Sequence, residues 1–293
     1  MHAMNGAAGD FASAHRIDKR QVRRSFDRSA RHYDAAAVLQ QRVEDENLRR
    51  LDLVRVQPQR VLDIGCGTGR GSRALARRYR GARVVSADLA PGMLRAARRR
   101  RRWFGRQAFV CADIERLPFA PQSFDLVHAG LVMQWCNDLD ATLRGLAGCL
   151  RPGGLLTFTT FGPDTLHELR TAWHGQGGTH VSAFIDMHDI GDALGRSGFE
   201  TPVLDVESYR LTYATFEDVA RDLKAIGARN ATAGRSRGLT GRAAWAQARA
   251  TYERWREDGR LPATYEVVYG HAWRAERPLA APGEAVAQWH PRR

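Results

Sequence analysis

The segment Arg60–Gly71, with the sequence RVLDIGCGTGRG, decides the fold of this 293-residue chain. The apolar run at 61–64 predicts a buried parallel strand, and glycines at 65, 67, 69 and 71 lead from it into a helical pattern. Glycines let a ligand approach the backbone, and the start of a helix offers free N–H groups. The dinucleotide pattern GxGxxG is not met, because the sixth position counted from Gly65 is Arg70. Taken alone, the loop also fits a tight strand-to-helix turn without a ligand.

Composition narrows the class of protein. A length of 293 residues with 43% hydrophobic content suits one large α/β domain. No apolar run approaches the roughly 20 residues of a membrane span, and the first residues lack the apolar core of a secretory signal. The four cysteines, Cys66, Cys111, Cys136 and Cys149, form neither CxxC pairs nor zinc-ligand spacings. We therefore expect a cytoplasmic protein with reduced thiols and no metal.

The formal net charge of +13 has two interpretations. A basic chain attracts acidic partners, such as nucleic acid, an anionic membrane or an acidic protein. The excess is almost all arginine and runs through the whole chain, which also fits a compositional bias without function.

The order of elements predicts an α/β fold with a doubly wound, mostly parallel, seven-stranded sheet. Strands are expected at 61–64, 83–87, 108–112, 124–129, 155–161, 201–213 and 264–273, and a helix at 163–173. The predicted organisation is a disordered tail (1–18), an N-terminal helical cap (19–57), a main domain (58–276) and a second disordered tail (277–293). The main domain includes inserted segments at about 162–190 and 227–260.

Acidic residues follow two of the predicted strands. Asp88 ends the second strand, 21 residues after Gly67, where an acid accepts hydrogen bonds from ribose hydroxyls in nucleotide-binding sheets. Leu89 and Met93 come next and suit packing against a flat base. Asp113 ends the third strand. Each acid alone also fits a helix N-cap.

The D-x-G-x-G-x-G pattern at 63–69, followed by these strand-end residues in order, resembles the class I S-adenosylmethionine (SAM)-dependent methyltransferases. The resemblance implies that Asp113 and Ile114 recognise adenine and that the residues after the fourth strand admit the amino-acid end of SAM. It also implies that Asp63 places the loop and reaches the cofactor's ammonium side through backbone or water. The implied cofactor-binding residues are Asp63, Gly65, Gly67, Asp88, Leu89, Met93, Asp113, Ile114, Ala129 and Leu131.

Longer segments resemble a narrower family, the malonyl-[acyl-carrier protein] O-methyltransferases of biotin synthesis. They are SFDRSARHYDAAAVLQQRV (25–43), LVMQWCNDL (131–139), TFGPDTLHELRTAWHGQGGTHVSAFIDMHDI (160–190), LKAIGARNATAGRSRGLTGR (223–242) and LPATYEVVYGHAW (261–273). The resemblance spans about residues 20–273. It implies methyl transfer from SAM to the free carboxylate of a malonyl thioester on acyl carrier protein, or on CoA. The sequence is compatible with a monomer or weak oligomer. That carboxylate is already ionised at pH 7, so no general base is needed.

The same resemblance suggests substrate-side residues. Tyr33 in the cap faces the methyl group, His180 donates to the carboxylate, Trp135 and Phe184 form apolar walls, and Gln134 orients the sulfonium or the substrate. Their plain alternatives are a hydrophobic lid residue, a loop histidine and ordinary core aromatics. A basic cluster suits the phosphate and acidic surface of a carrier protein, or is simply a solvated loop. Its members are Lys224, Arg229, Arg235, Arg237 and Arg242.

Three rival functions remain open at this point. One is methylation of another small carboxylic acid or a CoA thioester. Another is an RNA methyltransferase, although AGLVMQW (129–135) stands where enzymes that methylate amino groups of bases often carry an Asn/Asp-Pro-Pro-aromatic motif. The third is an inactive SAM-fold scaffold, which is disfavoured because every cofactor position holds a competent residue.

Overall fold

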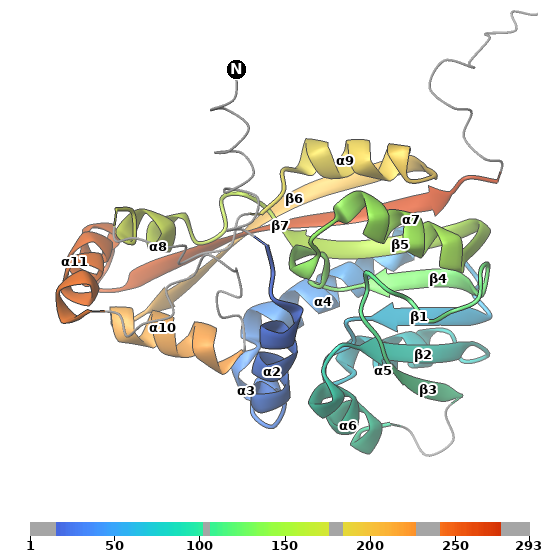
Figure 1. Ribbon diagram of the computed structural model, residues 1–293, viewed down its shortest axis with the longest axis horizontal. Helices are drawn as coiled ribbons and strands as arrows, with labels where there is room; N and C mark the ends of the chain where they lie inside the picture. The colour runs from blue at the N-terminus through green and yellow to red at the C-terminus, as the bar shows by residue number, and fades with distance from the viewer. Residues whose placement is uncertain (1–15, 102–105, 176–183, 227–240, 277–293) are drawn as a thin grey trace, which may run out of the picture.

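The computed structural model describes residues 16–101, 106–175, 184–226 and 241–276, and its centre is one seven-stranded sheet (Figure 1). The strand order is β3-β2-β1-β4-β5-β7-β6. β1 to β5 pair in parallel, and β7 runs antiparallel to both of its neighbours. This confirms the predicted doubly wound, mostly parallel fold. The strands are β1 (Arg60–Ile64), β2 (Arg83–Asp88), β3 (Gln107–Cys111), β4 (Phe124–Ala129), β5 (Leu150–Phe161), β6 (Phe199–Tyr213) and β7 (Leu261–Arg274).

Alternate residues of the central strands pack on opposite faces of the sheet. Val61 of β1 lies in one apolar cluster with Leu75 of α5 (Arg70–Arg78). Leu62 lies in a second cluster with Leu143 of α7 (Leu139–Cys149) and Ile190 of α9 (Met187–Arg196). α6 (Pro91–Arg99) connects β2 to β3. Both faces of the parallel sheet are therefore covered, as buried parallel strands require.

The N-terminal cap consists of α2 (Lys19–Ser29), α3 (Tyr33–Ala36), α4 (Val38–Arg50) and the short η1 (Leu51–Leu53). The helices of the cap are interrupted at 30–32, between α2 and α3, and at Ala37, between α3 and α4. α4 buries Leu39, Val43 and Asn47, one residue per helical turn. Asn47 is the polar member of this stripe.

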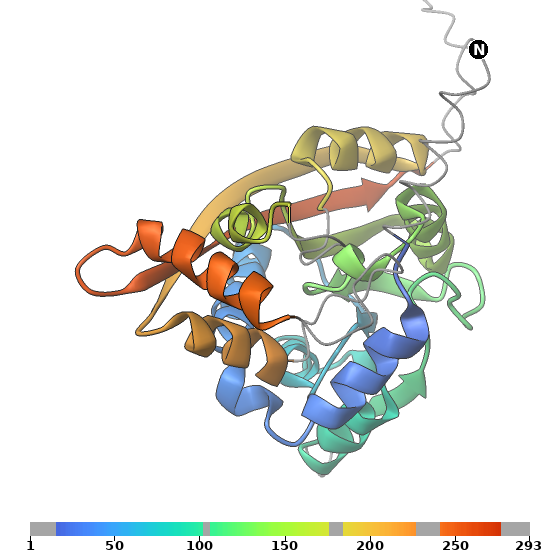
Figure 2. The same ribbon diagram turned by 60° about the vertical axis from the view of Figure 1, so that its left-hand side comes forward.

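The long strands β6 and β7 carry the remaining helices to one side of the sheet (Figures 1 and 2). These are α8 (His167–Ala172), α10 (Phe216–Ala225) and α11 (Arg242–Tyr252), followed by η3 (Glu253–Trp255). Phe216 packs against Trp245 and Tyr252, with ring centroids 4.9 and 5.2 Å apart. These residues belong to a second apolar core, which is separate from the core around the parallel strands β1 to β5.

Two predicted elements begin four or five residues away from their predicted starts, whereas the other strands begin within three residues of theirs. The helix expected at 163–173 begins only at His167, because Leu166 takes a positive φ of 56° and its N–H donates to Thr264 O of β7 at 2.7 Å. The strand expected at 155–161 begins at Leu150, which pairs with Phe124 before an irregularity in the ladder. In both places pairing with another strand outweighs the local pattern.

No helix in the described ranges is long and apolar enough to cross a membrane. The four cysteines are free thiols.

Candidate functional site

A pocket lies at the carboxyl ends of β1 to β4, beneath the cap. Its floor comes from the β1–α5 loop and from the residues that end β2, β3 and β4. Its roof comes from α2, α3 and α4, which Figure 1 shows against this edge of the sheet. Nine of the ten predicted cofactor-binding residues line this pocket: Asp63, Gly65, Gly67, Asp88, Leu89, Met93, Asp113, Ile114 and Leu131. The tenth, Ala129, lies in the apolar core beneath it.

The glycine loop is shaped by its contacts as well as by its backbone angles. Gly65 has a φ of 74°, and a Cβ there would stand 2.6 Å from Cβ of Val132. Gly67 has a φ of 52°, and a Cβ added there would meet nothing within 4 Å, so its pocket side is open. Gly69, with a φ of 80°, is the N-cap of α5. A positive φ disfavours a side chain at all three positions, and the contact with Val132 adds a steric reason at Gly65.

Asp88 links the glycine loop to β2. Its Oδ2 accepts from Gly67 N–H at 2.9 Å, and its Oδ1 accepts from Ala90 N–H at 2.8 Å. Burial raises the pKa of Asp88 to about 6, against the opposing effect of these two hydrogen bonds. The carboxylate is thus held rigidly and still borders the pocket.

At the far end of the floor, Asp113 is paired with the cap. Lys19 Nζ of α2 lies 2.9 Å from Asp113 Oδ1 and 2.6 Å from Glu115 Oε2. Ile114 is buried beside this pair and also lines the pocket. The predicted adenine-recognising acid is therefore also an anchor for the cap.

Asp63 is buried, and both of its oxygens are engaged. Oδ1 lies 2.9 Å from Nδ1 of His128 on β4, and Oδ2 accepts from the Ser72 hydroxyl. His128 Nε2 lies 3.0 Å from Asn47 Nδ2 and 3.7 Å from Glu44 Oε1, both on α4. Burial opposes charge on the ring, but Glu44 and Asp63 raise the pKa of His128 above its usual value.

Three aromatic side chains form a row in the roof and wall. Phe26 of α2 makes edge contacts with Tyr33, at 6.3 Å between centroids, and with Trp135, at 5.6 Å. Burial raises the pKa of Tyr33, so its hydroxyl remains protonated at neutral pH. Gln134 Nε2 donates to Leu131 O at 2.7 Å, which fixes that amide beside the pocket. The structure thus brings together three of the four predicted catalytic residues, namely Tyr33, Gln134 and Trp135.

The other predicted substrate-side residues are placed differently. Phe184 packs against Phe161, with centroids 5.6 Å apart, and lines a second pocket that shares Gln134 and Phe161 with the first. Lys224 and Arg242 are exposed, and Ile226, two residues after Lys224, lines the main pocket. Four residues lie outside the described ranges: His180, Arg229, Arg235 and Arg237. The sequence also carries an arginine run at 98–102. Its described members, 98–101, are exposed, and Arg100 pairs with Asp34 of the cap at 3.0 Å.

Several pocket residues were missing from the site expected from the sequence. Lys19, Phe26, Glu44 and Thr68 line the pocket, and His128 lies behind it. Two signals were available in the sequence: Asn47 interrupts the apolar stripe of α4, and His128 interrupts the apolar strand FDLVHA. Polar residues in buried runs need partners, so both positions point to a buried polar network.

Comparisons with known proteins identify first the fold and then the family. Residues 62–158 match a family model described as a methyltransferase domain. The YcgJ protein from Bacillus subtilis shares the fold, with a TM-score of 0.56 and 13% identity over 80% of this chain and 100% of that one. A malonyl-[acyl-carrier protein] O-methyltransferase from Methylovorus sp. (strain MP688) is 57% identical, over 96% of this chain and 98% of that protein. The chain belongs to the malonyl-[acyl-carrier protein] O-methyltransferase family.

The similarity to this family covers both halves of the molecule. A second relative with the same name, from Laribacter hongkongensis (strain HLHK9), is 56% identical over 94% of this chain and 96% of that protein. These alignments extend well beyond residues 62–158, so they include the cap and the β6–β7 region. The chain is accordingly an O-methyltransferase, as the resemblance of its motifs implied.

Proposed function

We propose that this protein uses SAM to methylate the free carboxylate of a malonyl group carried on acyl carrier protein, an early step in biotin synthesis. The observation that carries the proposal is the identity of 57% and 56% to full-length relatives that bear this activity in their names. The products are the methyl ester of the malonyl thioester and S-adenosylhomocysteine. The carboxylate oxygen forms a bond to the methyl carbon while the bond between that carbon and the sulfonium sulfur breaks.

The residues of the pocket suit SAM. Gly67 leaves its pocket side open, the Asp88 carboxylate suits ribose hydroxyls, and Leu89 with Met93 offers an apolar surface for a base. Asp113 and Ile114 are proposed to contact adenine at the far end. When bound, SAM supplies an electrophilic methyl group. The protein's tasks are then to hold the reacting oxygen in line with that methyl group and to exclude water.

The cap supplies the substrate side of the site in this proposal. Tyr33 has a protonated hydroxyl in a buried setting, which suits donation to a malonyl carboxylate oxygen. Trp135 and Phe26 cover the space beside it with apolar surface. No general base is required, because the malonyl carboxylate is ionised at neutral pH. Phe184 and the second pocket give the thioester arm an apolar path.

The decisive assay is methyl transfer from SAM to malonyl-acyl carrier protein, followed by mass spectrometry, with malonyl-CoA and bulk RNA in parallel. We expect a mass gain of one methylene unit (CH2) on the malonyl arm, because the methyl group replaces the proton of the acid. Tyr33→Phe should raise KM by about 5- to 10-fold, as expected for the loss of one hydrogen bond, whereas it should leave SAM affinity unchanged. The larger change Tyr33→Ala should lower kcat as well, because it opens the aromatic row.

Each alternative has its own result in this assay. Wild-type kinetics for Tyr33→Phe together with a defect in Tyr33→Ala would make Tyr33 a lid residue that does not contact the carboxylate. Transfer to malonyl-CoA at equal efficiency would remove the carrier protein from the specificity. Transfer to RNA, with none to either thioester, would refute the proposed substrate.

A further inference from the structure

The carboxylate of Glu44 is the unusual polar group of the pocket. It projects from α4, its side chain is only 16% exposed, and its Oε1 is buried without a hydrogen-bond partner among the described residues. The nearest cationic group described is His128, with Nε2 3.7 Å from Oε1. Buried carboxylates without partners are costly, so such a group in a ligand pocket points to a ligand that satisfies it.

Two glycines make room for this carboxylate. A Cβ at Gly71, in the first turn of α5, would overlap Glu44 Oε1, and a Cβ at Gly130, after β4, would stand 2.6 Å from Oε2. Neither glycine has a positive φ, so backbone conformation does not require them. At both positions the absence of a side chain leaves the space that the Glu44 carboxylate occupies.

The other carboxylates of the pocket are already engaged. Asp63 binds His128 and Ser72, Asp88 binds two backbone N–H groups, and Asp113 binds Lys19. Asp34 accepts from Thr68 Oγ1 at 2.6 Å and pairs with Arg100. Among the described residues that line the pocket, Glu44 is the carboxylate left for a cation.

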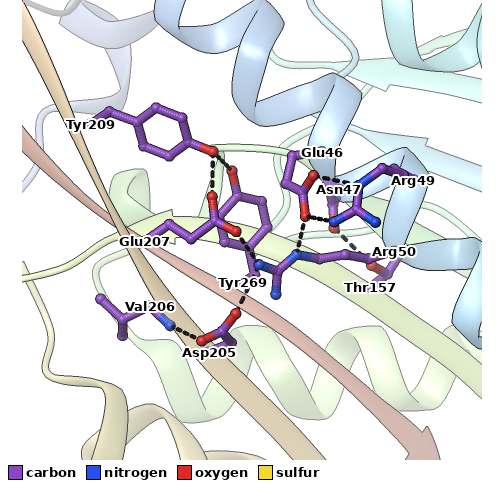
Figure 3. Close-up of polar contacts among 10 residues, drawn as sticks. All are labelled: Glu46, Asn47, Arg49, Arg50, Thr157, Asp205, Val206, Glu207, Tyr209 and Tyr269. Atoms are coloured by element: carbon purple, nitrogen blue, oxygen red, sulfur yellow. Dashed lines mark hydrogen bonds and ion pairs between the residues drawn. The ribbon is translucent and has the colours of Figure 1, made fainter.

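The helix that carries Glu44 is held firmly in place by its next two turns (Figure 3). Arg50 pairs with Asp205 Oδ2 at 2.8 Å and with Glu207 Oε1 at 2.5 Å on β6, and its guanidinium lies 4.1 Å from the ring centre of Tyr269 on β7. Asn47 accepts from Thr157 Oγ1 of β5 at 3.1 Å. α4 is thus fastened to three neighbouring strands, which fixes the position from which Glu44 reaches the pocket.

The position of Glu44 along the pocket selects its ligand. A nucleoside recognised at the ends of β2 and β3 directs the rest of the cofactor toward β1 and β4, because the strand order is β3-β2-β1-β4. Gly130 and His128 place Glu44 at the β4 side. Resting on the proposed use of SAM, we propose that Glu44 binds the α-ammonium group of the cofactor's methionine end and so favours cofactors that carry a free amine.

The test compares ligands before it compares variants. Isothermal titration calorimetry would measure binding of S-adenosylhomocysteine, of an analogue in which hydrogen replaces the α-amino group, and of 5′-methylthioadenosine. In the wild-type protein we expect both amine-free ligands to bind at least about 10-fold more weakly than S-adenosylhomocysteine, because charge-assisted hydrogen bonds are the strong ones. Equal affinity for S-adenosylhomocysteine and its amine-free analogue would overturn the inference.

The variant Glu44→Gln keeps the shape and removes the charge. It should bind S-adenosylhomocysteine about 10- to 100-fold more weakly, while its affinity for 5′-methylthioadenosine should equal that of the wild type. Asp52→Asn, the same change at an exposed acid just after α4, is the matched control and should leave all three affinities unchanged. Wild-type affinities in Glu44→Gln would overturn the inference.

Folding and the proposed function are separated within the same experiment. Because Glu44→Gln removes a buried charge, its ligand-free melting temperature should equal or exceed that of the wild type, and a melting scan checks this. If the variant does not fold, the ligand comparison on the wild type still decides the question. If the wild type does not bind S-adenosylhomocysteine at all, both the proposed function and this inference fail.

Discussion

The floor and the roof of the pocket hold their polar groups in different ways. In the floor, Asp88 and Asp113 come at strand ends, and Asp88 fixes the glycine loop through backbone N–H groups. In the roof, the cap depends on side-chain contacts between distant parts of the chain, such as Lys19 with Asp113 and Arg50 with Glu207. The floor is therefore specified mainly by local sequence, whereas the roof is specified by long-range pairing.

This difference indicates which property, cofactor affinity or stability, a substitution in the floor or in the roof should change first. A substitution in the floor alters the backbone that meets the cofactor, so it should affect binding directly. A substitution in the roof network should first affect stability and the placement of the cap, and cofactor affinity only as a consequence. Three predictions test this contrast, from the largest expected effect to the smallest.

Gly65→Ala should have the largest effect. A φ of 74° disfavours any side chain, and the new Cβ would stand 2.6 Å from Val132 Cβ, so the loop must move. We expect calorimetry to show that affinity for S-adenosylhomocysteine falls by at least about 100-fold, which corresponds to a loss of about 2.7 kcal/mol of binding free energy. Gly67→Ala is the paired variant, since its Cβ meets nothing within 4 Å. It should cost about 1 kcal/mol in stability and leave the loop in place.

Gly65→Ala should also destabilise the ligand-free protein more than Gly67→Ala does, because only the Cβ at 65 meets Val132. Equal losses of stability in urea unfolding would contradict this difference between the two glycines.

Asp88→Asn should come next, with a loss of about 10- to 100-fold in cofactor affinity from a weakened charge-assisted contact to ribose. Since burial raises the pKa of Asp88 from 3.8 to about 6, wild-type affinity should fall as pH drops below 6. In the ligand-free protein the sign is opposite. The folded state binds more protons than the unfolded state between pH 3.8 and 6, so the contribution of Asp88 to stability decreases as pH rises.

Calorimetry between about pH 5 and 8 checks this prediction. Burial also raises the pKa of Glu44, to about 7, so Asp88→Asn should lose only the part of the wild-type change near pH 6. A variant that keeps the full pH dependence would exclude Asp88 as the titrating group.

Arg50→Ala should have the smallest effect on cofactor affinity and a clear one on stability. It removes the partner of Glu46, Asp205 and Glu207 together, so we expect about 1–3 kcal/mol of destabilisation in urea unfolding. Asp205→Ala is the control, because Asp205 is 57% exposed and should cost less than about 1 kcal/mol.

If Arg50→Ala were as stable as the control, the apolar face of α4 would suffice to hold the cap, and the contrast between floor and roof would weaken.

Much of the floor could be predicted from the sequence because its signals lie within short segments of the chain. Each acid stands next to its own apolar strand, Asp88 at the end of one and Asp113 just after the next, and the glycines follow Asp63 directly, so each signal can be read within a few residues. Tyr33, Gln134 and Trp135 were named from family resemblance, and their roles remain predictions although all three line the pocket.

The helices of the roof and Tyr33 were predicted, but the polar contacts that Glu44 and Lys19 make from the roof were not, and the reason is physical. Glu44 is identified only when α4 is placed against Gly71 and Gly130, and Lys19 only when α2 is placed over Asp113. Hydrophobic periodicity locates a helix and its buried face, but it does not say which strand end that face will meet. The same limit explains why the helix expected at 163–173 begins late, since its start is set by β7.

The strand order also has a consequence for biosynthesis. In the part of the chain that the structure describes, β6 pairs only with β7, which the ribosome makes later. β7 inserts between β6 and β5. Until β7 emerges, the nascent chain exposes the open edge of β5 and a long unpaired strand, the kind of surface that invites aggregation. The floor of the pocket precedes both strands and has its strand partners early. Arg50 must wait for β6 and β7 before its anchor is complete, so the nascent protein acquires its cofactor floor before its cap is locked.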